Sequence, residues 1–378
     1  MITITSDFEC GNAKNVTQTG DNRHRLEVVG DKPVYCYYFC FDVRNDGEAT
    51  TAVIEVWHDP VIDDVPGFIS HFPSTIWIQL EGAGRYQPLV FGECETHDDH
   101  LVIHLPLAAG QTVRVTDVWP STYTDTCDFL RGLAEERSDR CKLFTLGQSV
   151  QGRDILGVRC GTPGKPRVLG VAGQHPIEFP GIWGMRGIAD FMTSLVPDAR
   201  ALREELLVEI IPMVCPDGTV MGRNGFNAED LDMYQSFGDT PDAPEPEAHE
   251  SRLLWDKAVA DRPDLWMNIH CYLGWRGNSE HPYDGWYEVA DPVFSDPKQA
   301  RLYQAFCDTM RLQTTGPSTH ITAATHSPNT TEYQLAKRFG IPHVFYEING
   351  GTAGPYGAGK RALEVFQRAT TTLLSPPA

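Results

Sequence analysis

The pattern of hydrophobic and polar positions changes near residue 125. Before this point the apolar positions fall in short runs rich in Val, Ile, Tyr, Phe and Thr, which favour strands. Turn residues such as Asn45-Asp46-Gly47 separate the runs, and no long amphipathic pattern indicates a helix. The clearest runs are 34–43, 52–57 and 112–115. We therefore expect residues 1–125 to form an antiparallel β-sandwich domain.

From residue 126 to residue 378, apolar runs of strand length alternate with helical patterns. The strand-like runs are 167–173, 207–214, 265–272 and 342–349. Helices are expected near 182–195, 246–259, 297–313, 330–339 and 358–374. This alternation is typical of an α/β domain, in which a mostly parallel or mixed sheet carries helices on both faces. The segment 119–136 opens this second domain or bridges the two.

Composition and charge narrow the class of protein. The 378-residue chain is 22% charged and 41% hydrophobic, as in globular proteins, and no stretch reaches the roughly 18 apolar residues of a membrane span. A net charge of −20 argues against a nucleic-acid partner, because such binding depends on Lys and Arg that neutralise phosphates. The first residues show neither the basic nor the apolar region of a secretory signal, so we expect a cytoplasmic protein with no membrane partner. The sequence does not decide whether the chain forms a homo-oligomer.

Three residues form a candidate metal site. His175 and Glu178 stand three apart where an apolar run ends and a helix should begin, and His270 ends another apolar run. The carboxyl ends of strands in open α/β sheets are where such sites form. Two imidazoles and one carboxylate make a zinc ligand set that leaves a fourth position for water. The alternative for His175 and Glu178 is a chance pair of surface residues, and the alternative for His270 is a local hydrogen bond. The ten cysteines lack the close pairs that a cysteine zinc site needs.

Glu347 is an acidic residue inside a run that should be a buried strand. An unpaired carboxylate is costly to bury, so Glu347 should have a partner. One interpretation is a structural ion pair with Lys or Arg. Beside a metal site, the better interpretation is a general base that takes a proton from the water that the metal activates.

The order of these residues resembles that of the zinc carboxypeptidases of the carboxypeptidase A superfamily. The matching segments are His175-x-x-Glu178, 212–218, 229–232, His270 and Tyr346-Glu347. The first part of the chain is similar to the β-sandwich domain of the cytosolic carboxypeptidases, in the segments 6–12, 37–45 and 121–125. The resemblance therefore extends over nearly the whole chain.

The resemblance implies a role for each candidate residue. His175, Glu178 and His270 match the ligands of one zinc ion per chain, and Glu347 matches the general base. Arg223 falls where the family places an arginine that polarises the scissile carbonyl and stabilises the oxyanion. The alternative for Arg223 is an exposed residue of a Gly-rich loop.

The substrate end of the site departs from the family. Where the family has Asn-Arg after Asp-Leu, this sequence has Asp232 and Met233, so the arginine that grips a C-terminal carboxylate is missing. We expect Asp232 and Met233 to favour neutral or cationic groups at this position. Arg276 is a candidate replacement for the lost arginine, and its alternative is a solvated loop residue. His326 is nearest to the place of the family's mobile-loop tyrosine, and its alternative is an exposed loop residue.

These observations predict a carboxypeptidase-like zinc hydrolase that cleaves an amide bond in a peptide or a small molecule. Glu347 is expected to deprotonate the attacking water and to return the proton to the leaving nitrogen. Two alternatives remain. The first is an amidase or deacylase for substrates without a free C-terminal carboxylate, which the Asp232-Met233 pair favours. The second is a catalytically silent metal-binding scaffold.

Overall fold

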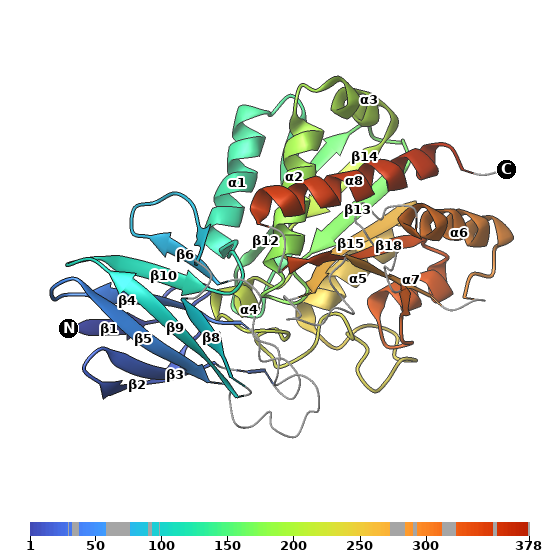
Figure 1. Ribbon diagram of the computed structural model, residues 1–378. Helices are drawn as coiled ribbons and strands as arrows, with labels where there is room; N and C mark the ends of the chain where they lie inside the picture. The colour runs from blue at the N-terminus through green and yellow to red at the C-terminus, as the bar shows by residue number, and fades with distance from the viewer. Residues whose placement is uncertain are drawn as a thin grey trace.

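The computed structural model describes residues 1–28, 30–31, 38–57, 76–89, 93–97, 99–272, 284–289, 293–311, 323–350 and 354–376. Figure 1 shows the first ten strands on the N-terminal side and a further sheet surrounded by helices. None of the helices in the described part of the chain is both long enough and apolar enough to span a bilayer.

The N-terminal strands form two sheets. The strands are β1 (Ile2–Thr5), β2 (Lys14–Gly20), β3 (Arg23–Glu27), β4 (Cys40–Asn45), β5 (Thr50–Trp57), β6 (Trp77–Leu80), β7 (Gln87–Pro88), β8 (Cys94–Thr96), β9 (His100–Leu107) and β10 (Thr112–Thr116). Their orders are β1-β4-β10-β6-β7 and β2-β3-β5-β9-β8. The first sheet is antiparallel, but the second contains the parallel pair β3 and β5. The expectation of a wholly antiparallel sandwich is wrong at this pair.

Alternating side chains build the core between these two sheets. Along β5, Ala52, Ile54 and Val56 are buried while the residues between them are partly exposed. Successive side chains of a strand point to opposite faces, so one face of β5 packs inward. Phe41 of β4 and Ile103 of β9 lie in the same hydrophobic cluster. The predicted run 34–43 is described only from residue 38 onward, and its strand begins at Cys40.

A mixed eight-stranded sheet forms the centre of the remaining chain, in the order β11-β12-β14-β13-β15-β18-β16-β17. Its strands are β11 (Cys141–Gln148), β12 (Asp154–Gly161), β13 (Arg167–Ala172), β14 (Leu207–Ile211), β15 (Leu265–Tyr272), β16 (Gly285–Glu288), β17 (Ala323–Thr325) and β18 (His343–Asn349). The four strands β14, β13, β15 and β18 run parallel to their neighbours in this group. They coincide with the four apolar runs of the sequence, because strands covered on both faces carry little polar surface.

Helices cover both faces of this sheet. They are α1 (Tyr123–Glu136), α2 (Phe179–Thr193), α3 (Pro197–Glu205), α4 (Pro216–Val220), α5 (His249–Asp261), α6 (Pro297–Arg311), α7 (Thr331–Phe339) and α8 (Pro355–Leu374). One hydrophobic cluster joins the sheet to α1, α2, α6 and α8, and another joins it to α5 and α7. The predicted mixed α/β class is confirmed. The domain division at residues 125 and 126 falls in the first turn of α1 and stays a prediction.

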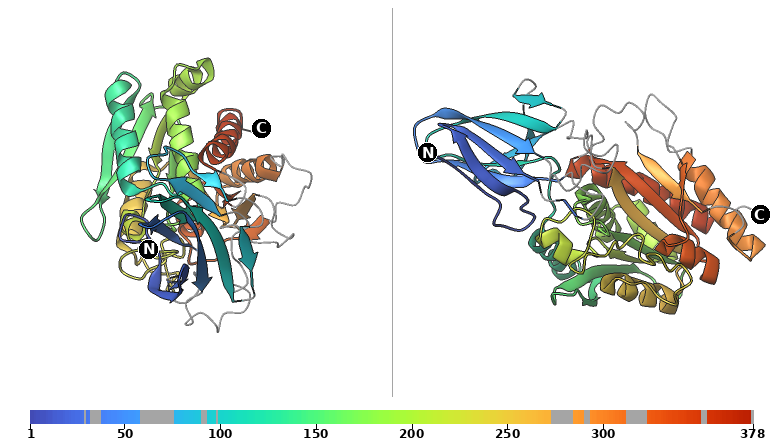
Figure 2. Two further views of the ribbon diagram at one scale, coloured as in Figure 1. Left: turned by 60° about the vertical axis from the view of Figure 1, so that its left-hand side comes forward. Right: turned by 90° about the horizontal axis from the view of Figure 1, so that it is seen from below.

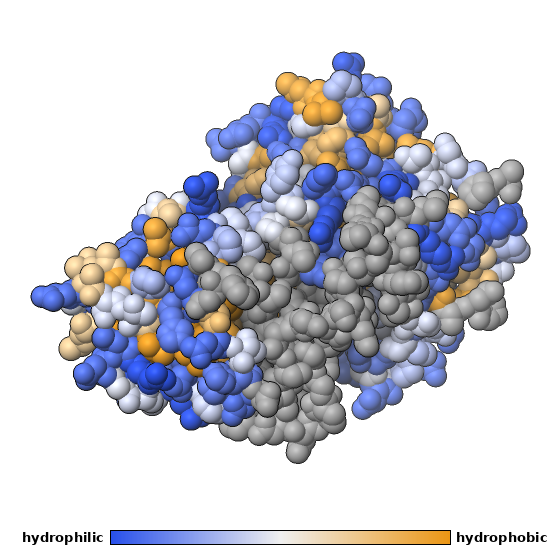
Figure 3. Space-filling model, viewed as in Figure 1, coloured by the Kyte–Doolittle hydropathy of each residue, from blue (hydrophilic) through white to orange (hydrophobic). Residues whose placement is uncertain are grey.

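Further views show how the sheets and the surface are arranged. Figure 2 shows the N-terminal strands set beside the helix-covered sheet. On the face drawn in Figure 3, hydrophilic residues predominate among the coloured ones, and apolar residues form separate patches. This distribution is ordinary for a chain with 22% charged residues.

A glycine allows α2 to approach β15 closely. A Cβ atom at Gly181, in the first turn of α2, would lie 2.4 Å from the carbonyl oxygen of Ile269. That distance is below any real contact, so a side chain here would push the helix away from the strand. The residue after Ile269 is His270, and α2 begins directly after Glu178. The close packing at Gly181 therefore brings two candidate metal ligands together.

Replacing Gly181 by Ala should lower the free energy of unfolding by roughly 1–3 kcal/mol, because the new methyl group overpacks this contact. Gly132 in α1 is the matched control, since a Cβ atom there has no neighbour within 4 Å. Gly132→Ala should raise the free energy of unfolding by about 0.5–1 kcal/mol through helix propensity alone. Urea unfolding of both variants measures these changes, and an equal sign for the two would contradict the packing argument.

Candidate metal and catalytic site

The carboxyl ends of β13, β15 and β18 bring the candidate residues to one place. These strands are neighbours and parallel, with Ala172 opposite Ile269 and His270 opposite Glu347. His175 follows the end of β13, and Glu178 is the N-terminal flanking residue of α2. The right-handed return from a parallel strand to its helix places such loops above the strand ends.

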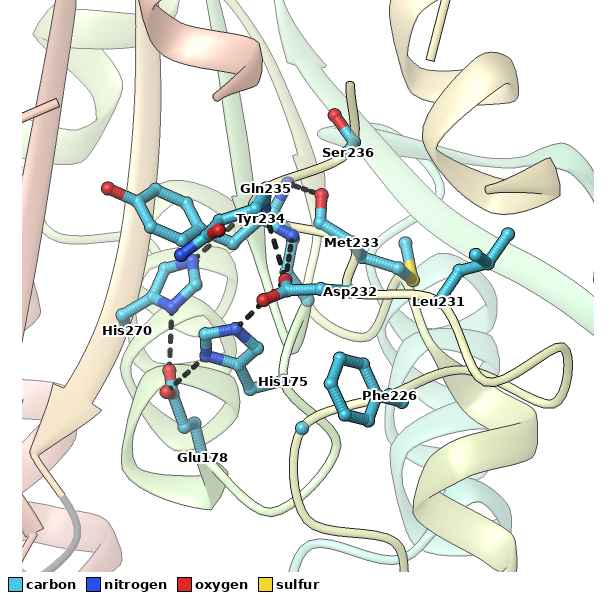
Figure 4. A network of polar contacts seen from close by, with 12 residues as sticks. His175, Glu178, Phe226, Leu231, Asp232, Met233, Tyr234, Gln235, Ser236 and His270 are labelled. Atoms are coloured by element: carbon cyan, nitrogen blue, oxygen red, sulfur yellow. Dashed lines mark hydrogen bonds and ion pairs between the residues drawn. The ribbon is translucent and has the colours of Figure 1, made fainter. Parts of the chain in front are cut away.

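His175, Glu178 and His270 converge as the sequence predicts. One donor atom from each lies within 4.8 Å of the other two, and all three side chains are buried. The Nδ1 atoms of His175 and His270 lie 2.6 and 2.7 Å from the two carboxylate oxygens of Glu178, as Figure 4 shows. Two nitrogens and a carboxylate on one point form a donor set that fits zinc.

The charge of Glu178 is held in place by its surroundings. Burial alone would raise the pKa of this carboxyl, but the charges of His270 and His175 prevail and lower the pKa to about 2. The backbone N–H of Cys271 also donates to Oε2 of Glu178, at 3.0 Å. A buried carboxylate that stays ionised is suited to bind a cation.

Asp232 lies behind His175. Its Oδ1 is 3.3 Å from Nε2 of His175 and accepts the backbone N–H groups of Tyr234 and Gln235 at 2.8 and 3.1 Å. Burial would raise the pKa of Asp232, but the contact with His175 and these backbone donors lower it. A carboxylate on the outer ring nitrogen of a metal-binding His orients the ring. Asp232 thus contacts the candidate ligand set, and its predicted role in substrate binding stays a prediction.

Gln174 contacts the outer ring nitrogen of His270, as Asp232 contacts that of His175. Its Oε1 lies 2.9 Å from Nε2 of His270 and accepts a hydrogen bond from Asn268 at 2.8 Å. Asn268 also donates to Oε1 of Glu332 at 2.7 Å, and Trp266 donates to the same oxygen at 3.1 Å. Sequence reasoning missed this network. Polar Gln174 just after one apolar run and Asn268 inside another are a signal, but nothing local marks Glu332.

Glu347 stands next to His270 in the register of β15 and β18. It is buried, and its Oε2 has no hydrogen-bond partner. Among the described residues Glu347 makes no ion pair with Lys or Arg, so the alternative of a structural ion pair finds no support there. Burial first, and then the charge of Glu178, raise the pKa of Glu347 well above its usual value. A nearby divalent cation would oppose this shift.

Aromatic rings border the ligand set. The ring centroid of Tyr234 lies 6.0 Å from that of His175 and 5.7 Å from that of His270, while Phe345 stacks on His270 at 4.4 Å. The hydroxyl of Tyr234 is 3.0 Å from Nδ1 of His326. His326 is buried, contrary to the alternative of an exposed loop residue, and burial lowers its pKa well below the usual value. His326 is therefore a neutral member of this aromatic wall.

Met233 is not at the surface of the site. It is fully buried in the hydrophobic cluster that contains Trp255 and Phe237. The prediction that its side chain binds substrate is wrong, because the side chain faces the core.

Of the two arginines predicted at the site, the structure describes only Arg223. Nε of Arg223 is 3.3 Å from Asp31, its Nη1 donates to the carbonyl of Asn227 at 2.9 Å, and its Nη2 contacts Asp230. Arg223, Asp31 and Asp230 line a cleft of about 530 Å³, and His175, Glu178 and His270 are not among its lining residues. An oxyanion role for Arg223 stays a prediction. Arg276 lies outside the described residues.

Fold and site together define an α/β protein with a buried two-histidine, one-glutamate centre. Residues 126–253 match the model of the zinc carboxypeptidase family. This confirms the resemblance found in the sequence.

Curated relatives point to one branch of this family. Over 259 residues the chain is 26% identical to cytosolic carboxypeptidase 2 of Danio rerio, covering 62% of this chain and 36% of the relative. Over 291 residues it is 25% identical to cytosolic carboxypeptidase 6 of Mus musculus, covering 72% of this chain and 53% of the relative. The chain thus spans between about a third and a half of the length of these two proteins.

Solved structures share the fold over the whole chain. A metallo-carboxypeptidase from Burkholderia cenocepacia aligns with a TM-score of 0.81 at 17% identity and covers 99% of both chains. A metallo-carboxypeptidase from Pseudomonas aeruginosa, solved with (2-guanidinoethylmercapto)succinic acid, aligns with a TM-score of 0.76 at 18% identity and covers 98% of both chains. At these identities the likeness establishes the fold.

Replacing Gln174 by Ala should weaken zinc binding by about 10- to 100-fold, because Nε2 of His270 loses the acceptor that orients its ring. Competition with a chromophoric chelator measures the dissociation constant. Gln148→Ala, at an exposed position of β11, is the control and should bind zinc like the unaltered chain. Unchanged zinc affinity in Gln174→Ala would contradict the orienting role.

Proposed function

We propose that this chain is a zinc-dependent hydrolase of amide bonds, with one zinc ion held by His175, Glu178 and His270. The observation that carries the proposal is the buried convergence of these donors beside an unpaired Glu347. The family match and the names of the relatives support the same chemistry. The relatives named cytosolic carboxypeptidases also support our proposal that the chain acts in the cytoplasm, on a peptide or a small amide.

Each residue has a defined part in this chemistry. Bound zinc supplies Lewis acidity, which polarises a carbonyl and lowers the pKa of water to about 7. Glu347 accepts the proton of the attacking water and later delivers it to the leaving nitrogen. Asp232 and Gln174 hold the two imidazoles in the orientation that directs Nδ1 to the metal. The aromatic rings around the ligands limit the access of bulk water.

Glu347→Gln should abolish hydrolysis while zinc stays bound, because the amide keeps the size of the side chain but accepts no proton. The expected loss in kcat is at least about 10²- to 10⁴-fold, the usual contribution of general-base catalysis. Metal content and steady-state kinetics on the same preparation measure both properties. Glu48→Gln, at an exposed turn, is the control. Undiminished turnover in Glu347→Gln would contradict the assignment.

A second candidate function is the hydrolysis of amides that lack a free C-terminal carboxylate. The positions beside the ligands carry the carboxylate Asp232 and the uncharged rings of Tyr234 and Phe345. Of the two predicted arginines, Arg223 is already paired with Asp31 and Asp230. Within the described part of the site, therefore, no free cation is in place to bind a substrate carboxylate.

A pair of matched substrates separates the two functions. An N-acyl dipeptide and its C-terminal amide differ only in the terminal charge. If substrates without a carboxylate are preferred, kcat/KM should be higher for the amide, because Asp232 repels the free acid. A preference for the acid would support a carboxypeptidase, with a cation from outside the described residues. Zinc binding without turnover of any amide in a broad panel would instead support the silent scaffold.

A further inference from the structure

The loop that leads to Asp232 is held by residues from the segments that connect the first N-terminal strands. The backbone N–H of Cys10 donates to the carbonyl of Val220 at 3.2 Å. Asn12 Nδ2 donates to the carbonyl of Gly222 at 2.9 Å, and the backbone N–H of Tyr38 donates to Asn224 at 2.9 Å. Segments separated by about two hundred positions thus bond directly along residues 220–224.

Asp31 makes the strongest of these contacts. Its Oδ2 accepts the backbone N–H groups of Gly225 at 2.7 Å and Phe226 at 3.0 Å, and its Oδ1 faces Nε of Arg223 at 3.3 Å. The carboxylate is buried, with 5% of its surface exposed. Hydrogen bonds to an ionised acceptor are roughly twice as strong as neutral ones, so this side chain fixes the loop at two consecutive peptide units.

The fixed loop continues directly to the metal centre. Phe226 forms a β-bridge with Asp232, and Asn227 closes the turn between them by accepting the N–H groups of Glu229 and Leu231. Asp232 then contacts Nε2 of His175. Figure 4 shows Phe226 beside Asp232 and His175. A shift of the peptide units at 225 and 226 would therefore move the carboxylate that orients a metal ligand.

We propose that Asp31 is a positioning residue of the metal centre, acting through Phe226 and Asp232 on His175. The N-terminal part of the chain would then help to orient a metal ligand, in addition to packing beside the second sheet. The inference rests on the proposed function, because it takes His175 to be a zinc ligand. It adds a residue that lies outside the zinc carboxypeptidase match at residues 126–253.

The test compares Asp31→Ala and Asp31→Asn with Asp42→Ala in the full chain. Asp42 forms a two-bond ion pair with Arg114 inside the N-terminal sheets, at 2.8 and 2.9 Å, so its removal deletes a similar interaction away from the loop. Zinc dissociation constants come from chelator competition and Tm from thermal unfolding. The kinetic constants are measured well below the lowest Tm.

Asp31→Ala should weaken zinc binding by about 10-fold or more and lower kcat, as loss of an orienting group does. Asp31→Asn keeps an acceptor oxygen for the two N–H groups and should fall between Asp31→Ala and the unaltered chain. Asp42→Ala should lower Tm and leave zinc affinity within about twofold. If Asp31→Ala does not fold, the intermediate zinc affinity of Asp31→Asn supports the inference.

Several results would overturn the inference. Unaltered zinc affinity and kcat in the Asp31 variants would contradict the positioning role of Asp31 and leave the proposed function intact. Equal weakening of zinc binding in Asp42→Ala would show that general destabilisation is the cause and would also contradict that role. Absence of zinc binding in the unaltered chain would overturn the proposed function itself, and this inference with it.

Discussion

The buried charge of Glu178 is the constraint on which the site depends. An ionised carboxylate away from water is unstable unless positive or donating groups face it. Here two imidazoles and the N–H of Cys271 do so, and they come from β15 and from the loop after β13. Glu347 is also buried, on the strand next to His270. The site therefore holds two buried carboxylates, those of Glu178 and Glu347. A divalent cation held between His175, Glu178 and His270 would offset that excess of negative charge.

This constraint explains how the surrounding chain is packed. The ligands meet only if α2 lies almost against β15, which the missing side chain of Gly181 permits. The outer nitrogens of both imidazoles need fixed acceptors, and Asp232 and Gln174 provide them. Those acceptors are in turn held by backbone N–H groups and by a buried amide, so the orientation of the ligands draws on several separate segments.

The same arrangement bears on the choice of substrate. Aromatic rings and a carboxylate lie beside the ligand set, whereas Arg223 is turned toward two aspartates. The candidate metal site thus stands in surroundings that do not favour an anion at the described positions.

The sequence by itself determined the central strands, the α/β class and the convergence of His175, Glu178, His270 and Glu347. It could do so because parallel strands covered on both faces are apolar throughout, and polar residues at their carboxyl ends meet at one edge. It could not assign Asp232, Met233 or the network of Gln174 and Glu332, nor the contact from Asp31. Those depend on which side chains from distant segments of the chain meet in the fold. Only the tertiary structure decided them, because hydrogen bonds across some two hundred positions leave no local pattern in the chain.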